Sequence, residues 1–172
     1  MNARKASALV ALVAGLALLV AGPAAAKKNP SPPLSEQTAV AWSDGAQELR
    51  VAPGQVTANL MAVAGGCRNI YVWRSGTNSI GSTLWKYILT VEWCWDGYRI
   101  TSLFRQPRGE VYYPLWSYSP YDAANAGGVG SSYAYTWRQG HFALCAMWCA
   151  QHTYPWIGVT ARADGSYSWS TG

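Results

Sequence analysis

Acidic side chains are scarce in this chain of 172 residues, which carries 8 Asp and Glu against 13 Lys and Arg. Hydrolysis of a glycosidic bond usually needs two carboxyl groups about 5 to 9.5 Å apart. The nearest pair in a segment expected to be ordered, Glu92 and Asp96, is spread along a strand that ends in a turn, and it does not give that geometry. A pair assembled from distant strands is the remaining route to such an enzyme.

Motifs of other enzyme classes are absent as well. The chain has no Gly-x-Ser-x-Gly sequence, the turn that exposes the nucleophile of many serine hydrolases. The glycine-rich segment 127–132 lacks the lysine of a phosphate-binding loop and precedes an expected strand, where such a loop needs a helix. We therefore expect a non-enzymatic protein, with a small hydrolase as the alternative.

The excess of basic residues is too small to indicate nucleic-acid binding. Arg4 and Lys5 lie in the apolar N-terminal segment 1–26. The rest of the chain has 11 basic and 8 acidic residues, a net charge of +3. These basic residues are scattered along the chain, whereas nucleic-acid binders concentrate them on one face or in runs. We expect no nucleic-acid partner.

The only long apolar run lies in residues 1–26. Arg4 and Lys5 precede an apolar segment over 6–22, and three alanines end at Ala26. A basic start, an apolar centre and small residues at the end are typical of a secretory signal peptide. The run of about 17 residues is at the short limit of a membrane span of roughly 20, which makes an uncleaved anchor the weaker alternative. We expect cleavage after Ala26, a secreted product that is extracellular or associated with the cell wall, and no stable membrane insertion.

Cleavage would leave 146 residues, the usual size of one domain. Residues 27–33 are polar and rich in proline, which predicts an extended tail. A single domain is expected over 34–172.

The four cysteines, Cys67, Cys94, Cys145 and Cys149, predict two disulfides in an exported chain. Three pairings are possible. An immunoglobulin-like sandwich favours a bridge from Cys94 to either Cys145 or Cys149, with Cys67 taking the other cysteine, although the sequence alone does not choose.

His141, Cys145, Cys149 and His152 are the tightest cluster of reactive side chains, and on a helix the first three would lie on one face and could bind a metal ion. The surrounding sequence favours strands, on which residues four apart are separated by about 13 Å, too far for one zinc ion. We therefore expect disulfides, no metal or other cofactor, and two histidines that are ordinary polar residues at strand ends.

Alternation of apolar and polar residues predicts strands from Cys67 onward. In the clearest one the residues of one parity form a single apolar face: Trp85, Tyr87, Leu89, Val91, Trp93 and Trp95. Asp96-Gly97 predicts a type I′ turn, after which residues 98–104 return as the partner strand.

Turn-forming residues divide the rest of the chain. Turns are predicted at 107–109, 138–140 and 164–165, a long loop is predicted over Ser119–Gly130, and residues 51–64 are expected to be mostly extended. Strands are expected over 111–118, 133–137, 141–148, 154–163 and 166–170. Seven or more short strands at this spacing predict an all-β protein, an antiparallel β-sandwich of immunoglobulin-like type.

Aromatic residues are abundant but selective, with 10 Trp and 11 Tyr against 2 Phe. Trp and Tyr suit both half-buried strands and wet binding surfaces. The segment 111–121 holds four candidate ligand-binding residues: Tyr112, Trp116, Tyr118 and Tyr121. The first three would share one face of a strand, and the sequence leaves open whether that face is core or solvent. If it is exposed, a polysaccharide or an extracellular protein would suit it.

A resemblance supports the β interpretation. Gly65-Gly66-Cys67-Arg68, Trp73-Arg74-Ser75, the segment 81–87 (Gly-Ser-Thr-Leu-Trp-Lys-Tyr) and the segment 93–102 (Trp-Cys-Trp-Asp-Gly-Tyr-Arg-Ile-Thr-Ser) together resemble small exported β-domain proteins of actinobacteria, whose function is unassigned. The preference for Arg over Lys and the abundance of Ala and Gly are similar to proteins of such bacteria. The resemblance covers about 35 residues, and it implies no catalytic or binding residue.

The sequence thus predicts a secreted, disulfide-stabilised binding or interaction domain that uses surface Trp and Tyr. Besides a hydrolase, the remaining alternative is an inhibitor or toxin that inserts the loop over Ser119–Gly130 into a target.

Overall fold

The computed structural model describes residues 37–49 and 65–172, all within the unit Ser31–Gly172. The expected signal peptide with its cleavage site, the tail over 27–33 and the extended segment over 51–64 lie outside the described residues. Within the described ranges, no helix has the length and apolar character needed to cross a membrane.

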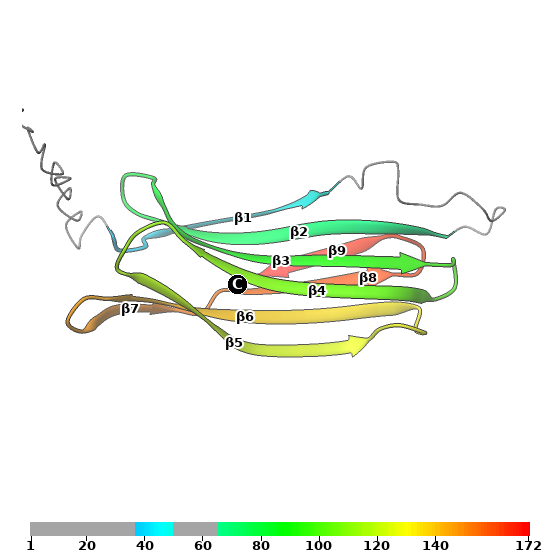
Figure 1. Cartoon of the computed structure of the whole chain (residues 1–172). Coiled ribbons are helices and arrows are strands. Elements are labelled where there is room, and N and C mark those ends of the chain that lie inside the picture. The colour runs from blue at the N-terminus through cyan, green and yellow to red at the C-terminus, as the bar shows by residue number, and fades with distance from the viewer. Residues whose placement is uncertain (1–36, 50–64) are drawn as a thin grey trace, which may run out of the picture. The chain divides into compact units, whose positions relative to one another are not determined.

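Two antiparallel sheets pack face to face (Figure 1). Sheet A has the order β1 (Ala41–Glu48), β2 (Gly66–Thr77), β3 (Thr83–Trp95) and β4 (Ile100–Val111). Sheet B has the order β5 (Trp116–Gly127), β6 (Tyr133–Cys145), β8 (Trp156–Arg162) and β9 (Tyr167–Thr171), and β7 (Cys149–Thr153) pairs with the C-terminal part of β6. The predicted antiparallel β-sandwich is confirmed.

The core lies between the two sheets, and β3 contributes most to it. Five of the six β3 residues of the predicted apolar face are at most 1% exposed: Trp85, Tyr87, Leu89, Val91 and Trp93. Sheet B contributes mainly Phe142 and Leu144 of β6 to this core, and both are fully buried. The Trp85 and Phe142 rings stack with centroids 4.5 Å apart. Period-2 alternation therefore identified the inner face of β3 correctly.

Three predicted breaks in the strands are wrong. β4 runs through Pro107, which pairs with Leu89; because β4 is the edge strand of sheet A, a residue without an N–H group is tolerated there. β6 runs through the predicted turn over 138–140, since Gln139 pairs with Asp122 of β5 and Trp156 of β8.

Most of the predicted loop over Ser119–Gly130 is also strand. β5 continues to Gly127 because its Gly- and Ala-rich half pairs residue by residue with β6, and this pairing overrides the low strand propensity of the segment. The inhibitor or toxin hypothesis loses the long loop on which it depended.

The two Asp-Gly hairpins are confirmed at 96–97 and 164–165, but the turn type predicted for the first is wrong. A type I′ turn needs two residues of positive φ, and in the described residues only glycines have one, Gly97 at +92° and Gly165 at +80° among them. The Asp96 carboxylate accepts hydrogen bonds from the backbone N–H groups of Arg99 and Tyr98 at 2.9 and 3.0 Å, which lowers the pKa of this carboxyl.

The two predicted disulfides are confirmed, whereas the favoured pairing is wrong. Cys67 bonds Cys94, its direct partner across β2 and β3, and Cys145 bonds Cys149 at the turn between β6 and β7. Each bridge lies within one sheet, since Cys67 and Cys94 face outward as cross-strand partners and Cys145 and Cys149 are paired at the end of one hairpin. Such bonds are typical of an oxidising compartment.

Candidate functional site

Two of the four predicted ligand-binding residues lie inside the sandwich. Trp116 is 5% exposed, and its indole N–H donates a 2.7 Å hydrogen bond to the Gln37 carbonyl oxygen. Tyr118 is half-buried, with its ring centroid 5.0 Å from that of Phe142 and 6.0 Å from that of Tyr87. Trp116 therefore belongs to the core, which answers the question that the sequence left open.

The neighbouring phenols Tyr87 and Tyr118 reflect this burial. Loss of hydration raises the pKa of Tyr118 above its usual value. The same cause, reinforced by Tyr118, raises the pKa of Tyr87 well beyond the usual range for a tyrosine. Both side chains act as neutral core residues.

The other two predicted residues are exposed but lie in different places. Tyr112 is 53% exposed in the connection between β4 and β5, and its hydroxyl donates a 2.5 Å hydrogen bond to Glu110. Tyr121 is 62% exposed on β5 of sheet B. The four residues therefore do not form one surface.

The outer face of sheet A holds a groove of about 380 Å³. Alternation along β2, β3 and β4 places its residues in cross-strand rows, one of which is Tyr71, Thr90 and Gln106. We call this surface the groove face and define it by its lining residues: Leu49, Tyr71, Lys86, Ile88, Thr90, Gln106, Arg108 and Glu110.

An aromatic pair borders the groove face on the β2 side. The rings of Tyr71 and Trp73 have centroids 5.6 Å apart, and the Lys86 ammonium lies 4.9 Å from the Trp73 ring centroid. Trp73 lies across Gly45 of β1, where an added Cβ would be 2.4 Å from the ring. Any larger residue at position 45 would displace the indole. The Tyr71 hydroxyl donates a 2.6 Å hydrogen bond to Gln47, which fixes the ring at the edge of the groove.

Hydrogen-bonding groups occupy the opposite side. Arg108 and Glu110 form a 2.7 Å ion pair on β4, and Tyr112 donates to the same carboxylate. That hydrogen bond to Glu110 raises the pKa of Tyr112. With Lys86 and Arg108 against Glu110, the groove face has one more positive than negative charge. One of the predicted residues, Tyr112, therefore supports a wall of this groove.

The outer face of sheet B carries a cluster of aromatic and imidazole rings. We call it the ring face and define it by the outward residues Tyr121, Trp137, His141, His152, Tyr154 and Trp156. His141 stacks on Tyr154 with centroids 4.7 Å apart and planes 10° apart, and Tyr121 meets Tyr154 edge to face at 4.9 Å. Trp137 and Trp156 lie next to each other at 6.5 Å.

Local sequence explains how the ring face is assembled. β7 and β8 both pair with β6, and they are separated only by Tyr154 and Pro155. Proline has no N–H to donate to a sheet ladder, so the strand is interrupted there. His152 and Tyr154 are two residues apart and project to the same outer face, on which His141 of β6 also lies.

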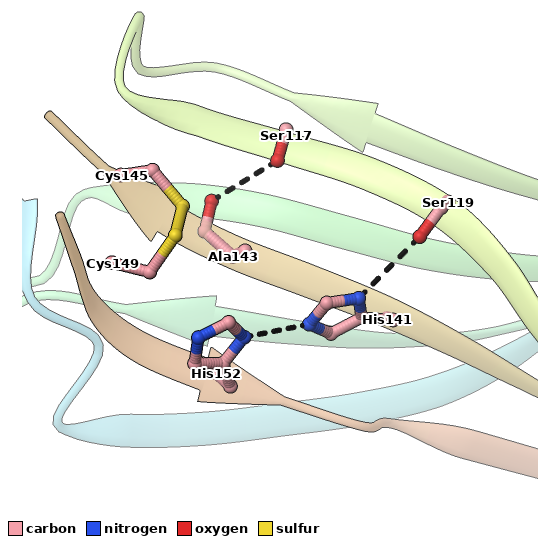
Figure 2. The surroundings of a disulfide bond; sticks show 7 residues. All are labelled: Ser117, Ser119, His141, Ala143, Cys145, Cys149 and His152. Atoms are coloured by element: carbon pink, nitrogen blue, oxygen red, sulfur yellow. Dashed lines mark hydrogen bonds between the residues drawn. A yellow bond between two sulfur atoms is a disulfide. The ribbon is translucent and has the colours of Figure 1, made fainter. Parts of the chain in front are cut away.

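The two histidines meet at this point, as Figure 2 shows. His141 Nε2 lies 2.9 Å from His152 Nδ1, and His141 Nδ1 lies 3.4 Å from the Ser119 hydroxyl of β5. The predicted position of His141 at a strand end is wrong, because β6 is continuous. A hairpin closed by Cys145–Cys149 would have placed the histidines nearly opposite each other, and that pairing is the sequence feature that could have revealed them.

The chemistry available at these contacts is limited. The arrangement of Ser119, His141 and His152 is that of a nucleophile, a base and an orienting group, but 3.4 Å exceeds the roughly 2.6 to 3.2 Å expected between an activated serine and its base. Among the described residues, no three His, Cys, Asp or Glu side chains converge as metal ligands. We assign no catalytic role to this cluster.

Comparison with known proteins adds no relative: no protein family, curated protein or solved structure matches the chain. The candidate sites are therefore judged on their own geometry. The groove face combines a concavity, an aromatic wall and converging polar groups, which are the usual features of a ligand site.

Proposed function

We propose that this protein is an extracellular, non-enzymatic domain that binds a carboxylate-bearing polysaccharide along the groove face. The observation that carries the proposal is the groove of about 380 Å³ on the outer face of sheet A, bordered by Tyr71 and lined by polar side chains from β3 and β4. The binding surface expected from the sequence is thereby moved from the segment 111–121 to this face.

The residue types fit a sugar chain. Tyrosine offers a large apolar face and loses little rotamer freedom on binding. Thr90, Gln106 and Glu110 provide hydroxyl, amide and carboxylate groups in adjacent strands, which suits the many hydroxyl groups of a saccharide. Thr90 and Gln106 are cross-strand partners about 4.8 Å apart, and Glu110 lies four residues farther along β4.

Charge narrows the class of polysaccharide. Lys86 and Arg108 both line the groove, and guanidinium groups bind carboxylates with matched geometry. The Arg108 side chain is 63% exposed although it contacts Glu110, so it is accessible to a ligand. A glycan that carries carboxylates, such as peptidoglycan, fits this face better than a neutral glycan such as chitin or cellulose.

An extracellular location agrees with three features. Two disulfides suit an oxidising compartment. Residues 1–26 have the pattern of a signal peptide. The resemblance to exported actinobacterial proteins points the same way, and a bacterial wall would then be the polymer nearest to the protein.

Retention on insoluble polysaccharides tests the proposal. The purified protein is mixed with peptidoglycan, chitin or cellulose, and the bound fraction is measured after sedimentation. We expect retention on peptidoglycan and loss of it in Arg108→Ala. Arg162→Ala is the charge-matched control, because Arg162 is exposed on β8 of sheet B.

Two results would contradict the proposal. Absence of retention on all three polymers would indicate a protein partner. Equal losses in Arg108→Ala and Arg162→Ala would show that net charge alone, and not the groove face, holds the polymer.

A further inference from the structure

We propose that His141 and His152 form a surface site for divalent copper on the ring face. This site is separate from the groove face, and it does not depend on the proposed function. The starting observation is the 2.9 Å separation between His141 Nε2 and His152 Nδ1. Two imidazole nitrogens that face each other at this distance share either a proton or a metal ion.

The distance is close to that between two neighbouring ligands of one metal ion. If a metal ion lay about 2.0 to 2.1 Å from each nitrogen, nitrogens 2.9 Å apart would give an N–metal–N angle of about 90°. A tetrahedral ion such as zinc would need the two nitrogens about 3.3 Å apart at the same bond lengths. An angle near 90° is that of neighbouring corners of a square, which is the preference of copper(II) and nickel(II), and copper(II) binds such ligands most tightly.

The present arrangement is a hydrogen-bonded pair, and a small movement converts it into a chelate. The imidazole planes are 12° apart and the rings lie edge to edge (Figure 2). Both lone pairs must turn toward a common point outside the sheet. The exposed His152 side chain has room for this rotation because it projects into solvent.

His141 is oriented by its surroundings. Its ring face stacks on Tyr154 at 4.7 Å, which fixes the plane of the imidazole and directs its two nitrogens at His152 and Ser119. Ser119 lies 3.4 Å from Nδ1. When the proton of neutral His141 is on Nδ1 and faces this hydroxyl, Nε2 presents its lone pair toward His152. A partner on the second nitrogen is the usual device that sets the tautomer of a metal-binding histidine.

The Cys145–Cys149 disulfide supports the site from the other side. It closes the β6–β7 hairpin, in which Ala143 pairs with His152. That register places His152 diagonally opposite His141. With two protein ligands, the copper ion keeps open positions for water or for a donor atom from another molecule.

The experiment is a titration of the purified, untagged protein with copper(II) chloride, followed by calorimetry and by electron paramagnetic resonance. The chain contains only two histidines, so the imidazole signal has one source. We expect one copper ion per chain with hyperfine coupling from two imidazole nitrogens. His141→Gln and His152→Gln should each lower the affinity at least tenfold and remove one of the two couplings.

Two serines of β5 provide a matched pair of variants. Ser119 contacts His141, whereas the hydroxyl of Ser117, two residues away, donates a 3.4 Å hydrogen bond to the Ala143 carbonyl oxygen. Ser119→Ala should lower the copper affinity about tenfold, as loss of such a supporting contact typically does. Ser117→Ala should leave it unchanged.

The proposal is overturned if the wild-type protein does not bind copper(II) at micromolar concentrations. It is equally overturned if both His→Gln variants bind with unchanged stoichiometry and affinity, since the metal would then be held by the chain terminus or another group. The spectrum of the wild-type protein gives an answer even if a variant folds poorly.

Discussion

The two outer faces of the sandwich share one core but carry different chemistry. On sheet A the outward positions of β2, β3 and β4 are mostly polar or charged and surround a groove. On sheet B a cluster of rings occupies part of the outer face, where His141 and Tyr154 stack on each other. Because strand alternation separates inner from outer residues, one shared core can support two outer faces with different side chains.

The largest effect should come from the core, because it supports both faces at once. Trp85 is fully buried and stacks on Phe142 across the two sheets. Trp85→Ala should lower the free energy of unfolding by about 3 to 5 kcal/mol, measured by urea denaturation. Trp148→Ala is the control, because Trp148 is 68% exposed and should change stability by less than about 0.5 kcal/mol. Similar values for the two variants would contradict the packing described for sheet A and sheet B.

The two disulfides, one in each sheet, should differ in their contribution to stability. Cys67–Cys94 closes 27 residues and Cys145–Cys149 closes 4. The loop-entropy relation gives about 3.5 kcal/mol for the first and about 2 kcal/mol for the second. Unfolding of the double variants Cys67→Ala/Cys94→Ala and Cys145→Ala/Cys149→Ala measures both. The reverse order would show that local contacts, and not the length of the closed loop, determine their value.

Polysaccharide binding should separate the two faces directly. Tyr71→Ala removes the aromatic border of the groove face, and we expect an affinity for peptidoglycan about tenfold lower, which corresponds to about 1.4 kcal/mol. Tyr121→Ala makes the same change on the ring face and should have no effect. Adsorption isotherms compare the two variants. Loss of binding in Tyr121→Ala alone would move the binding site to sheet B and restore part of the original sequence prediction.

A smaller loss of stability is expected at alkaline pH, because Tyr87 and Tyr118 are buried where the two sheets meet. Burial raises the pKa of both phenols, so the folded protein keeps protons that the unfolded chain releases near pH 10. The contribution of these phenols to the free energy of unfolding is therefore fully present below pH 10 and should decline as the pH rises above 10. Urea midpoints between pH 8 and 11 test this decline, which Tyr118→Phe should reduce. Tyr98→Phe is the control because Tyr98 is 83% exposed. Identical profiles for both variants and the wild type would contradict burial as the cause.

The fold class was predictable because the alternation is strong where the core is largest. From Trp85 to Trp93 the residues of one parity are all apolar and at most 1% exposed, and Ile88 is the one residue of the other parity in this stretch that is also apolar and buried. The Asp-Gly pairs marked the two hairpins correctly. Prediction failed where pairing partners decide the outcome: Pro107 is tolerated on an edge strand, and Gly127 belongs to β5 only because β6 lies beside it.

The candidate sites were less accessible to sequence reasoning than the fold. Aromatic density drew attention to the segment 111–121, but Trp116 faces the core. The groove face joins residues from β2 to β4 that are far apart along the chain, and none of them belongs to a motif. The sequence shows only the spacing of His141 and His152, whereas their contact depends on the register that Cys145–Cys149 imposes.

Nuclear magnetic resonance can show directly whether a polysaccharide binds on the groove face. Soluble peptidoglycan fragments are titrated into the isotopically labelled protein, and the backbone amide shifts are followed. We expect the largest changes on the groove face, at Tyr71, Thr90 and Gln106, with little change at Trp137 and Trp156. Shifts confined to the ring face, or no shifts at saturating fragment, would contradict it.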